Sequence, residues 1–124
     1  EAVNAFPSRK ILSNNGIDYI EVRKGDNFKS LAIELNLGYW QLPKYNEMTA
    51  ETELTEGQIL YIKPKKSECS QSSYTVKPGD TIVLISQETG IKSKYIYKYN
   101  NLPEGSRVEP GQQLYLKKQN QVKS

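Results

Sequence analysis

The chain repeats itself at a fixed distance of 54 residues. When residues 20–63 are placed beside residues 74–117, no gap is needed, and twelve of the 44 aligned pairs are identical. Apolar residues fill many of the other pairs, such as Leu31 with Ile85 and Leu42 with Ile96. A repeat that keeps its register over this length indicates two copies of one structural unit. The sequence therefore predicts two small units, each with its own core, instead of one domain of 124 residues.

The repeat divides the chain into five predicted segments. They are an N-terminal extension over 1–18, a first unit over 19–64, a linker over 65–73, a second unit over 74–118 and a polar tail over 119–124. The linker is polar and rich in serine, so we expect it to be exposed. Within the extension, Asn15-Gly16 separates two short runs with apolar residues, and this dipeptide favours a type I′ turn. We therefore expect a hairpin strand that pairs with the opening strand of the first unit.

Each copy has the pattern strand, helix, helix, strand. The first helix of copy one carries Phe28, Leu31, Ala32 and Leu35 on one face. The other elements are opening strands over 19–23 and 74–77, second helices over 39–46 and 93–100, and closing strands over 58–63 and 112–117. Pro43 is expected to delay or distort the first turn of the second helix in copy one. The predicted fold class is α+β: two βααβ units, each with two helices on a two-stranded antiparallel sheet, and an N-terminal hairpin.

Composition excludes several classes of function. The chain has no histidine, which excludes Ser-His-Asp and Cys-His nucleophile systems and His-ligated metal sites. Its single cysteine, Cys69, cannot form an intramolecular disulfide or a thiolate metal cage. Seventeen basic and fourteen acidic residues are interspersed, unlike the concentrated basic face of a nucleic-acid-binding protein. We expect no catalytic residue, no metal, no other cofactor and no nucleic-acid partner.

The remaining global features concern targeting and assembly. No apolar run approaches the roughly 18 residues of a membrane span, so we expect no membrane-spanning segment, and we expect a monomer. The chain begins at Glu1 without a charged region followed by an apolar one. We expect either that a signal peptide has been removed or that this chain is a piece of a longer protein.

Clustered glutamates raise the question of glycoside hydrolysis, which uses two carboxylates on either side of a cleft. The candidates lie in matching loops of the two copies: Glu47, Glu51, Glu53 and Glu56 in the first, Glu104 and Glu109 in the second. Because these loops are polar, we interpret the glutamates as solvated charges.

Three ordered motifs occur once in each copy. In the second copy they are Val76-Lys77-Pro78-Gly79-Asp80-Thr81-Ile82, then Asn100-Asn101-Leu102, then Val108-Glu109-Pro110-Gly111-Gln112-Gln113-Leu114. They resemble the LysM domain pattern V-x-x-G-D-T-L, N-x-L and I-x-x-G-Q-x-L. The first copy resembles it less closely, with Asn27, Phe28 and Pro43 where the usual pattern reads differently. The resemblance covers about 90 of the 124 residues.

The resemblance to LysM implies a βααβ fold and binding of glycans that contain N-acetylglucosamine, mainly bacterial peptidoglycan and also chitin. The tandem arrangement with its hairpin is similar to the C-terminal LysM region of certain secreted bacterial N-acetylglucosaminidases. That similarity implies an attached cell-wall hydrolase and an extracellular, periplasmic or cell-wall location. The predicted function is a non-catalytic carbohydrate-binding module that anchors the hydrolase. The alternative is a structural or protein-interaction module whose degenerate repeats have little glycan affinity.

Antiparallel pairing places the Gly-Asp loop and the loop after the second helix at the same edge of each unit, where they form a shallow groove. The glycines let the backbone approach a ligand, and the first N–H groups of the helix are available donors. Phe28 or Ile82 could supply apolar surface, together with Met48 or Leu102. Structural alternatives are helix capping by the aspartates and a turn requirement for the glycines. The candidate carbohydrate-binding residues are Gly79, Asp80, Thr81, Ile82, Asn101, Leu102 and Pro103 in copy two, and Gly25, Asp26, Asn27, Phe28, Glu47, Met48 and Thr49 in copy one.

Trp40 is the single tryptophan, and it aligns with Lys94 in the repeat. The core shared by both copies therefore does not require an aromatic ring there. Stacking on a sugar ring and packing against the hairpin or between the copies are equally good interpretations.

Overall fold

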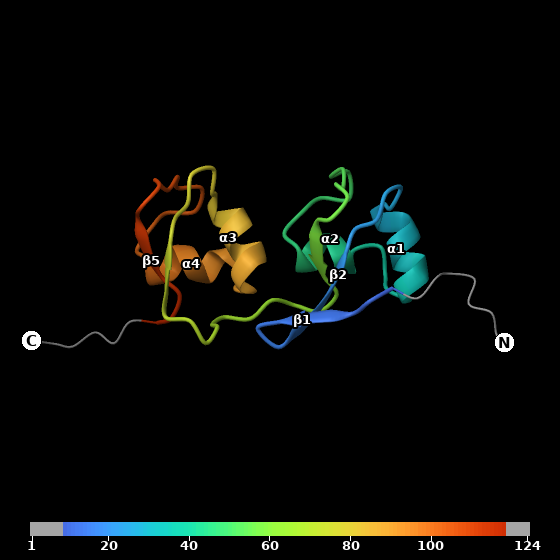
Figure 1. Ribbon diagram of the computed structural model, residues 1–124, viewed down its shortest axis with the longest axis horizontal. Helices are drawn as coiled ribbons and strands as arrows, with labels where there is room; N and C mark the ends of the chain where they lie inside the picture. The colour runs from blue at the N-terminus through green and yellow to red at the C-terminus, as the bar shows by residue number, and fades with distance from the viewer. Residues whose placement is uncertain (1–8, 119–124) are drawn as a thin grey trace, which may run out of the picture. The chain divides into compact units, whose positions relative to one another are not determined.

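The computed structural model describes residues 9–118, and the chain divides after Pro64 into two compact units (Figure 1). Unit 1 contains the first repeat, and unit 2 contains the second. Each unit has two helices and a small antiparallel sheet, so the predicted α+β class and the βααβ plan are confirmed.

Unit 1 is built on the three-stranded sheet β1-β2-β3. Its elements are β1 Leu12–Asn14, β2 Ile17–Glu21, α1 Phe28–Leu35, α2 Gln41–Tyr45 and β3 Ile59–Tyr61. β1 pairs antiparallel with β2, which confirms the expected hairpin strand, and β2 pairs antiparallel with β3. Asn15 and Gly16 both have positive φ, at 55° and 73°, as a type I′ turn requires.

Unit 2 has the two-stranded sheet β4-β5. Its elements are β4 Ser73–Thr75, α3 Ile82–Thr89, α4 Ser93–Tyr99 and β5 Gln113–Tyr115. β4 and β5 pair antiparallel, with Tyr74 opposite Leu114. The repeat therefore predicts both the element order and the strand direction of this unit.

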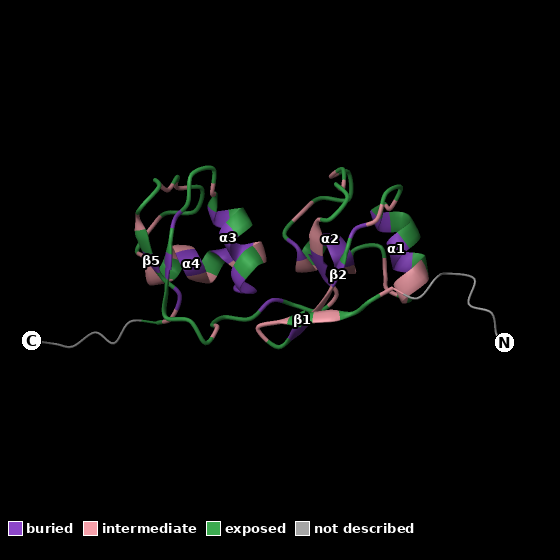
Figure 2. Cartoon of the chain, viewed as in Figure 1, coloured by how far each residue is buried: buried purple, intermediate pink, exposed green. Residues whose placement is uncertain are grey.

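Each unit buries its own core, as the burial colours in Figure 2 show. Residues at matching positions of the repeat occupy the two cores, among them Leu31 and Ile85, Leu42 and Ile96, and Leu60 and Leu114, all fully buried. A core of this size makes each unit only marginally stable. Polar contacts outside the core therefore matter to the stability of each unit.

The second helices of the two units differ in where they begin and in how long they are. α2 begins at Gln41, two residues later than the expected range, and Pro43 is its third residue. A proline is tolerated there because N–H groups in the first turn have no acceptor within the helix. α4 in the second unit begins at Ser93 and is two residues longer, at seven against five.

Most of the predicted linker over 65–73 is exposed, as expected, but its first residue is buried. Lys65 is only 3% exposed, and its Nζ donates to Ser86 Oγ and Gln87 Oε1, both at 2.7 Å. Lys66 forms a parallel bridge with Ile91 through backbone hydrogen bonds to Gly90 and Lys92. A lysine can be buried when its ammonium has hydrogen-bond acceptors. The start of this segment is thus packed on unit 2, although its composition is that of a linker.

Candidate functional site

The Gly-Asp pair of each unit forms a tight turn between the opening strand and the first helix. Gly25 and Gly79 have φ of +88° and +86°, a backbone conformation that other residues adopt at a cost. In the next position Asp26 Oδ2 accepts the Arg23 N–H at 2.7 Å, and Asp80 Oδ2 accepts the Lys77 N–H at 2.8 Å. The aspartates therefore close the turn and do not cap the helix.

Helix capping is carried out by the residues that follow the aspartates. Asn27 is the N-cap of α1 and accepts the Ser30 N–H at 2.8 Å, and Thr81 is the N-cap of α3 and accepts the Leu84 N–H at 3.2 Å. In unit 1 the Ser30 hydroxyl also accepts the Asn27 N–H, which completes a capping box. Among the described residues, no group of unit 2 plays this part for the Thr81 N–H. Unit 2 thus leaves one more backbone donor open at this loop than unit 1 does.

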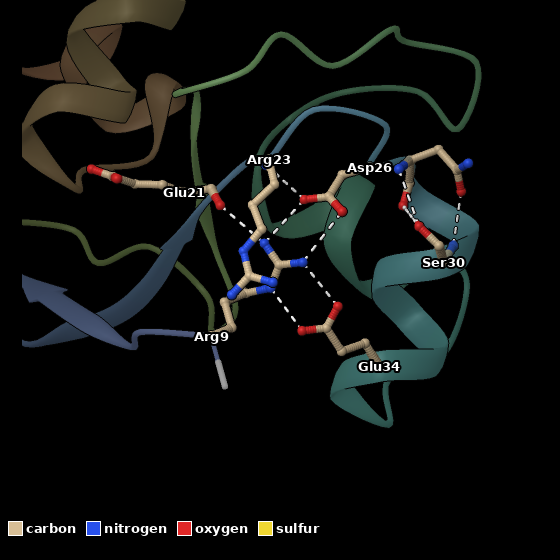
Figure 3. A network of polar contacts seen from close by, with 7 residues as sticks. Arg9, Glu21, Arg23, Asp26, Ser30 and Glu34 are labelled. Carbon is tan, nitrogen blue, oxygen red and sulfur yellow. Dashed lines mark hydrogen bonds and ion pairs between the residues drawn. The ribbon is translucent and has the colours of Figure 1, made fainter. Parts of the chain in front are cut away.

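The N-terminal extension contributes an arginine to the turn of unit 1, as Figure 3 shows. Arg9 binds Asp26 through Nη1 at 3.0 Å and Nη2 at 3.2 Å, and binds Glu34 through Nε and Nη2, both at 2.8 Å. Its Nη1 also donates to the carbonyl oxygen of Glu21 at 3.0 Å. The Arg9 side chain is 5% exposed, and the two carboxylate side chains are 14% exposed. The hydrogen bond to Glu34, followed by the contacts with Asp26, raises the pKa of Arg9. The Asp26 carboxylate is therefore engaged within the protein.

Unit 2 binds its equivalent carboxylates with different residues. The Tyr74 hydroxyl donates to Asp80 Oδ2 at 2.7 Å and to Glu88 Oε1 at 3.3 Å, and Lys77 Nζ also contacts Glu88 at 3.3 Å. Burial and the hydrogen bond to Asp80 raise the pKa of Tyr74 to about 12. Burial opposes ionisation of Asp80, but the Lys77 N–H and the Tyr74 hydroxyl outweigh it and lower the pKa of Asp80. Asp80 is therefore bonded within its own unit through Oδ2, whereas both carboxylate oxygens of Asp26 accept hydrogen bonds.

The asparagine motif closes the second helix of each unit and starts the loop on the other side of the predicted groove. Asn46 lies fully buried after α2, where its amide donates to Tyr61 O at 3.0 Å and its Oδ1 accepts the Tyr61 N–H at 2.7 Å. Asn100 makes the same pair of bonds with Tyr115 of β5. The amide thus acts as a short strand partner and fixes the end of the helix to the sheet.

The residue after each of these asparagines has left-handed backbone. Glu47 has φ of 58° and Asn101 has φ of 54°. Met48 N donates to Pro43 O and Leu102 N donates to Tyr97 O, both at 2.9 Å, which is the bond pattern of a Schellman motif. Met48 and Leu102 then pack against the core of their units. This turn directs the exposed residues that follow, Thr49 and Pro103, away from the core.

The structure divides the candidate carbohydrate-binding residues into two groups. Phe28 and Ile82 are buried core residues, at 6% and 2% exposed, so their side chains offer little surface to a ligand. The half-buried members are Asp26, Met48, Asp80 and Leu102, and the exposed members are Gly25, Asn27, Glu47, Thr49, Gly79, Thr81, Asn101 and Pro103. In Figure 1 the two loops that carry them lie toward the same end of each unit.

The other singled-out residues lie on the surface. Trp40 is 61% exposed, with Lys44 Nζ 5.5 Å from its ring centroid, and Tyr39 beside it is 65% exposed. The six clustered glutamates are all exposed. Among residues 9–118, no cluster of three or more Cys, Asp or Glu side chains has the arrangement of a metal site. No helix within that range is long and apolar enough to cross a membrane.

The first two motifs therefore have assigned structural parts in both units: a turn and a helix cap for the first, and a helix end bonded to the closing strand for the second. The LysM domain model matches residues 20–63 and 74–117, which are the two copies of the repeat. The chain belongs to the LysM family. LysM domains are known as modules that bind peptidoglycan and N-acetylglucosamine, and they are not catalytic.

Proteins similar to this LysM chain include cell-wall lytic enzymes. Membrane-bound lytic murein transglycosylase D of Escherichia coli, strain K12, is 28% identical over 82 residues, which are 63% of this chain and 18% of that protein. The protein of the same name from E. coli O6:H1 has the same identity and coverage. Among solved structures, the spore cortex-lytic enzyme SleL of Bacillus cereus is 33% identical, with 84% of this chain and 23% of that chain covered and a TM-score of 0.36. The match thus covers only a small part of each of these proteins.

Sequence reasoning missed two groups of residues. Arg9 lies outside the repeat, so no motif points to it. Tyr95, Tyr99 and Tyr115 line a cavity on unit 2. The enrichment of tyrosine in the second copy was the available signal, because Gln41 stands in the first copy where Tyr95 stands in the second.

Proposed function

We propose that this chain is a non-catalytic carbohydrate-binding module that recognises glycans containing N-acetylglucosamine. Bacterial peptidoglycan is the first candidate ligand, and chitin is a related one. Family membership supports this class of ligand. The observation that carries the proposal is that the motif aspartates, Asp26 and Asp80, and the motif asparagines Asn46 and Asn100 are bonded within their own units.

The groups that remain available for a ligand at the loops suit a neutral amino sugar. The loops present glycine backbone, the first N–H groups of a helix and small exposed side chains. N-acetylglucosamine has hydroxyls, an amide and an acetyl methyl, which need hydrogen-bonding groups and a small apolar contact and do not need a charge or a metal. The half-buried Leu102 and Met48 are the apolar candidates. We infer that unit 2 binds more tightly, because it keeps the Thr81 N–H open.

The wider role follows from the similar proteins. Cell-wall lytic enzymes carry regions like this chain, so we propose that it anchors an attached cell-wall hydrolase to its substrate, outside the cell, in the periplasm or at the cell wall. Two grooves on one polymer would gain roughly 10²- to 10⁴-fold in affinity if the geometry lets both bind.

The test is binding to purified insoluble peptidoglycan and to chitin oligosaccharides, by sedimentation and by titration calorimetry. Pro103 and Thr49 occupy the same position of the repeat and are both exposed, so Pro103→Lys and Thr49→Lys form a matched pair that blocks one groove each. We expect Pro103→Lys to weaken binding more, and moderate salt to have little effect on a neutral ligand. A chain that binds neither glycan would contradict the proposal.

A structural or protein-interaction role is the second candidate. Ile33, Tyr39 and Trp40 of unit 1 are each more than 60% exposed, and exposed apolar groups of this kind often mark contact surfaces. This role predicts a dimer in light scattering, lost in Trp40→Ala, together with no glycan affinity.

A further inference from the structure

A cavity of about 640 Å³ opens on unit 2, and the predicted groove does not account for it. Its lining residues all belong to unit 2. α4 contributes Tyr95, Lys98 and Tyr99, β5 contributes Tyr115, and the loop after α4 contributes Asn101. The volume lies within the range of ordinary ligand sites. Asn101 also belongs to the predicted groove, so the cavity and that groove share this residue.

Three tyrosine rings give the cavity its apolar surface. Tyr95 and Tyr99 are one turn apart on α4, and their rings stack with centroids 6.1 Å apart and an interplanar angle of 28°. The Tyr99 hydroxyl donates to Ser67 O at 2.6 Å, which fixes that ring against the segment after Pro64. Tyr115 is 50% exposed, while its backbone is held by Asn100. The aromatic surface is therefore held in place and still reachable.

The repeat provides an internal comparison for this surface. Tyr61 of unit 1 stands at the position of Tyr115, yet it is fully buried. The hairpin is the reason. Asn14 Nδ2 donates to the Tyr61 hydroxyl at 2.8 Å, and the Tyr19 ring packs edge-on against the Tyr61 ring, with the ring centroids 5.9 Å apart. Among the described residues, unit 2 has no such strand over Tyr115. The face that the hairpin covers in unit 1 is open in unit 2.

The rim of the cavity carries polar groups of both kinds. Lys98, Lys118 and Asn101 supply hydrogen-bond donors, and Glu68 supplies a carboxylate. A pyranose ring has an apolar C–H face that lies flat on an aromatic ring, and hydroxyls around its edge that need donors and acceptors. Mixed charges on the rim suit such a neutral, hydroxyl-rich ligand better than a strongly charged one.

We propose that this cavity is a second sugar subsite of unit 2, in which Tyr115 stacks on a pyranose ring of the same glycan that enters the loop groove. The inference rests on the proposed function and extends it from one groove to a longer binding path. It predicts that unit 2 distinguishes long oligosaccharides from short ones, because only a long one reaches the cavity. Unit 1 lacks this subsite, since its equivalent surface is covered.

The experiment compares three variants of the whole chain, titrated with a short and a long chitin oligosaccharide. Tyr115→Ala removes the ring, Tyr115→Phe keeps it, and Tyr39→Ala removes another exposed aromatic side chain, from unit 1. We expect Tyr115→Ala to lose about tenfold in affinity for the long oligosaccharide and nothing for the short one. Tyr115→Phe and Tyr39→Ala should bind both like the wild type.

A second pair of variants guards against misfolding of Tyr115→Ala. Lys98 lines the cavity, and Lys44 is its counterpart in the repeat, and both are exposed. Lys98→Gln should lower the affinity for the long oligosaccharide about two- to threefold, and Lys44→Gln should not. NMR shifts of Tyr95, Tyr99 and Tyr115 should move only with the long oligosaccharide.

Two results separate this inference from the proposed function. If the wild-type chain binds the long oligosaccharide and both Tyr115→Ala and Lys98→Gln bind it as tightly, the cavity is not a sugar subsite, while the proposed function stands. If the wild-type chain binds no glycan, both fail. A change of oligomeric state in Tyr115→Ala with unchanged glycan affinity would instead make this face a protein interface and overturn the subsite.

Discussion

At the scale of single residues, identical positions of the two copies have different partners. Asp26 and Asp80 both close their turns, but Arg9 holds the first and Tyr74 holds the second. The motif predicts the turn because the glycine and the aspartate are adjacent in sequence. It cannot predict Arg9, which lies 17 residues from Asp26 and 25 from Glu34 and belongs to no repeated pattern. Ion pairs between distant residues leave no periodic signal.

The network around Arg9 gives a residue-scale prediction. Arg9→Ala would leave the Asp26 and Glu34 carboxylates close together, mostly buried and without their cation. We expect it to destabilise unit 1 by about 3 kcal/mol, whereas Lys10→Ala, an exposed neighbour, should change little. Hydrogen exchange should show the loss in β2 and α1 and leave α3 unaffected. Equal stability of the two variants would mean that the ion pairs contribute nothing.

At the scale of elements, the periodicity and turn residues predict the strands, the helices and the hairpin. They do not predict the packing at the start of the segment after Pro64, because its polar composition gives no sign of the buried Lys65 or of the backbone bridge at Lys66. For the candidate groove, the pattern predicts which loops come together at one end of each unit. The pattern does not distinguish a core side chain such as Ile82 from a surface one, because an apolar residue can stand in either environment.

The buried lysine gives an element-scale prediction. Lys65→Ala removes two hydrogen bonds of 2.7 Å, to Ser86 Oγ and Gln87 Oε1, and leaves a gap beside α3. We expect unit 2 to lose about 2 kcal/mol of stability in denaturant unfolding. Lys63→Ala, two residues earlier and exposed, serves as the control and should be neutral. If both variants unfold like the wild type, the hydrogen bonds of Lys65 do not stabilise unit 2.

At the scale of the whole chain, the two units have the same fold but respond to pH through different groups. The first motif of unit 1 is held by a guanidinium, which stays charged over the accessible pH range. The matching motif of unit 2 is held by the Tyr74 hydroxyl and by Lys77, whose contacts with Tyr74 and Glu88 raise its pKa. Both of these groups titrate at high pH. We therefore expect unit 2 to lose stability before unit 1 under alkaline conditions.

The direction follows from the raised pKa of Tyr74. Its value is about 12 in the folded unit, against 10 in the unfolded chain, so the stabilising contribution is complete below pH 10 and is lost as pH rises from 10 through 12. Lys77 adds to the loss in the same direction, since its pKa is raised above 10.5. We expect the amides of β4 and α3 to lose protection in this interval before those of β2 and α1, with the Tyr74 hydroxyl contributing up to about 2 kcal/mol. Tyr74→Phe, which cannot ionise, should make unit 2 less stable at neutral pH but flatten its alkaline decline. A decline as steep in Tyr74→Phe as in the wild type would assign it to other groups.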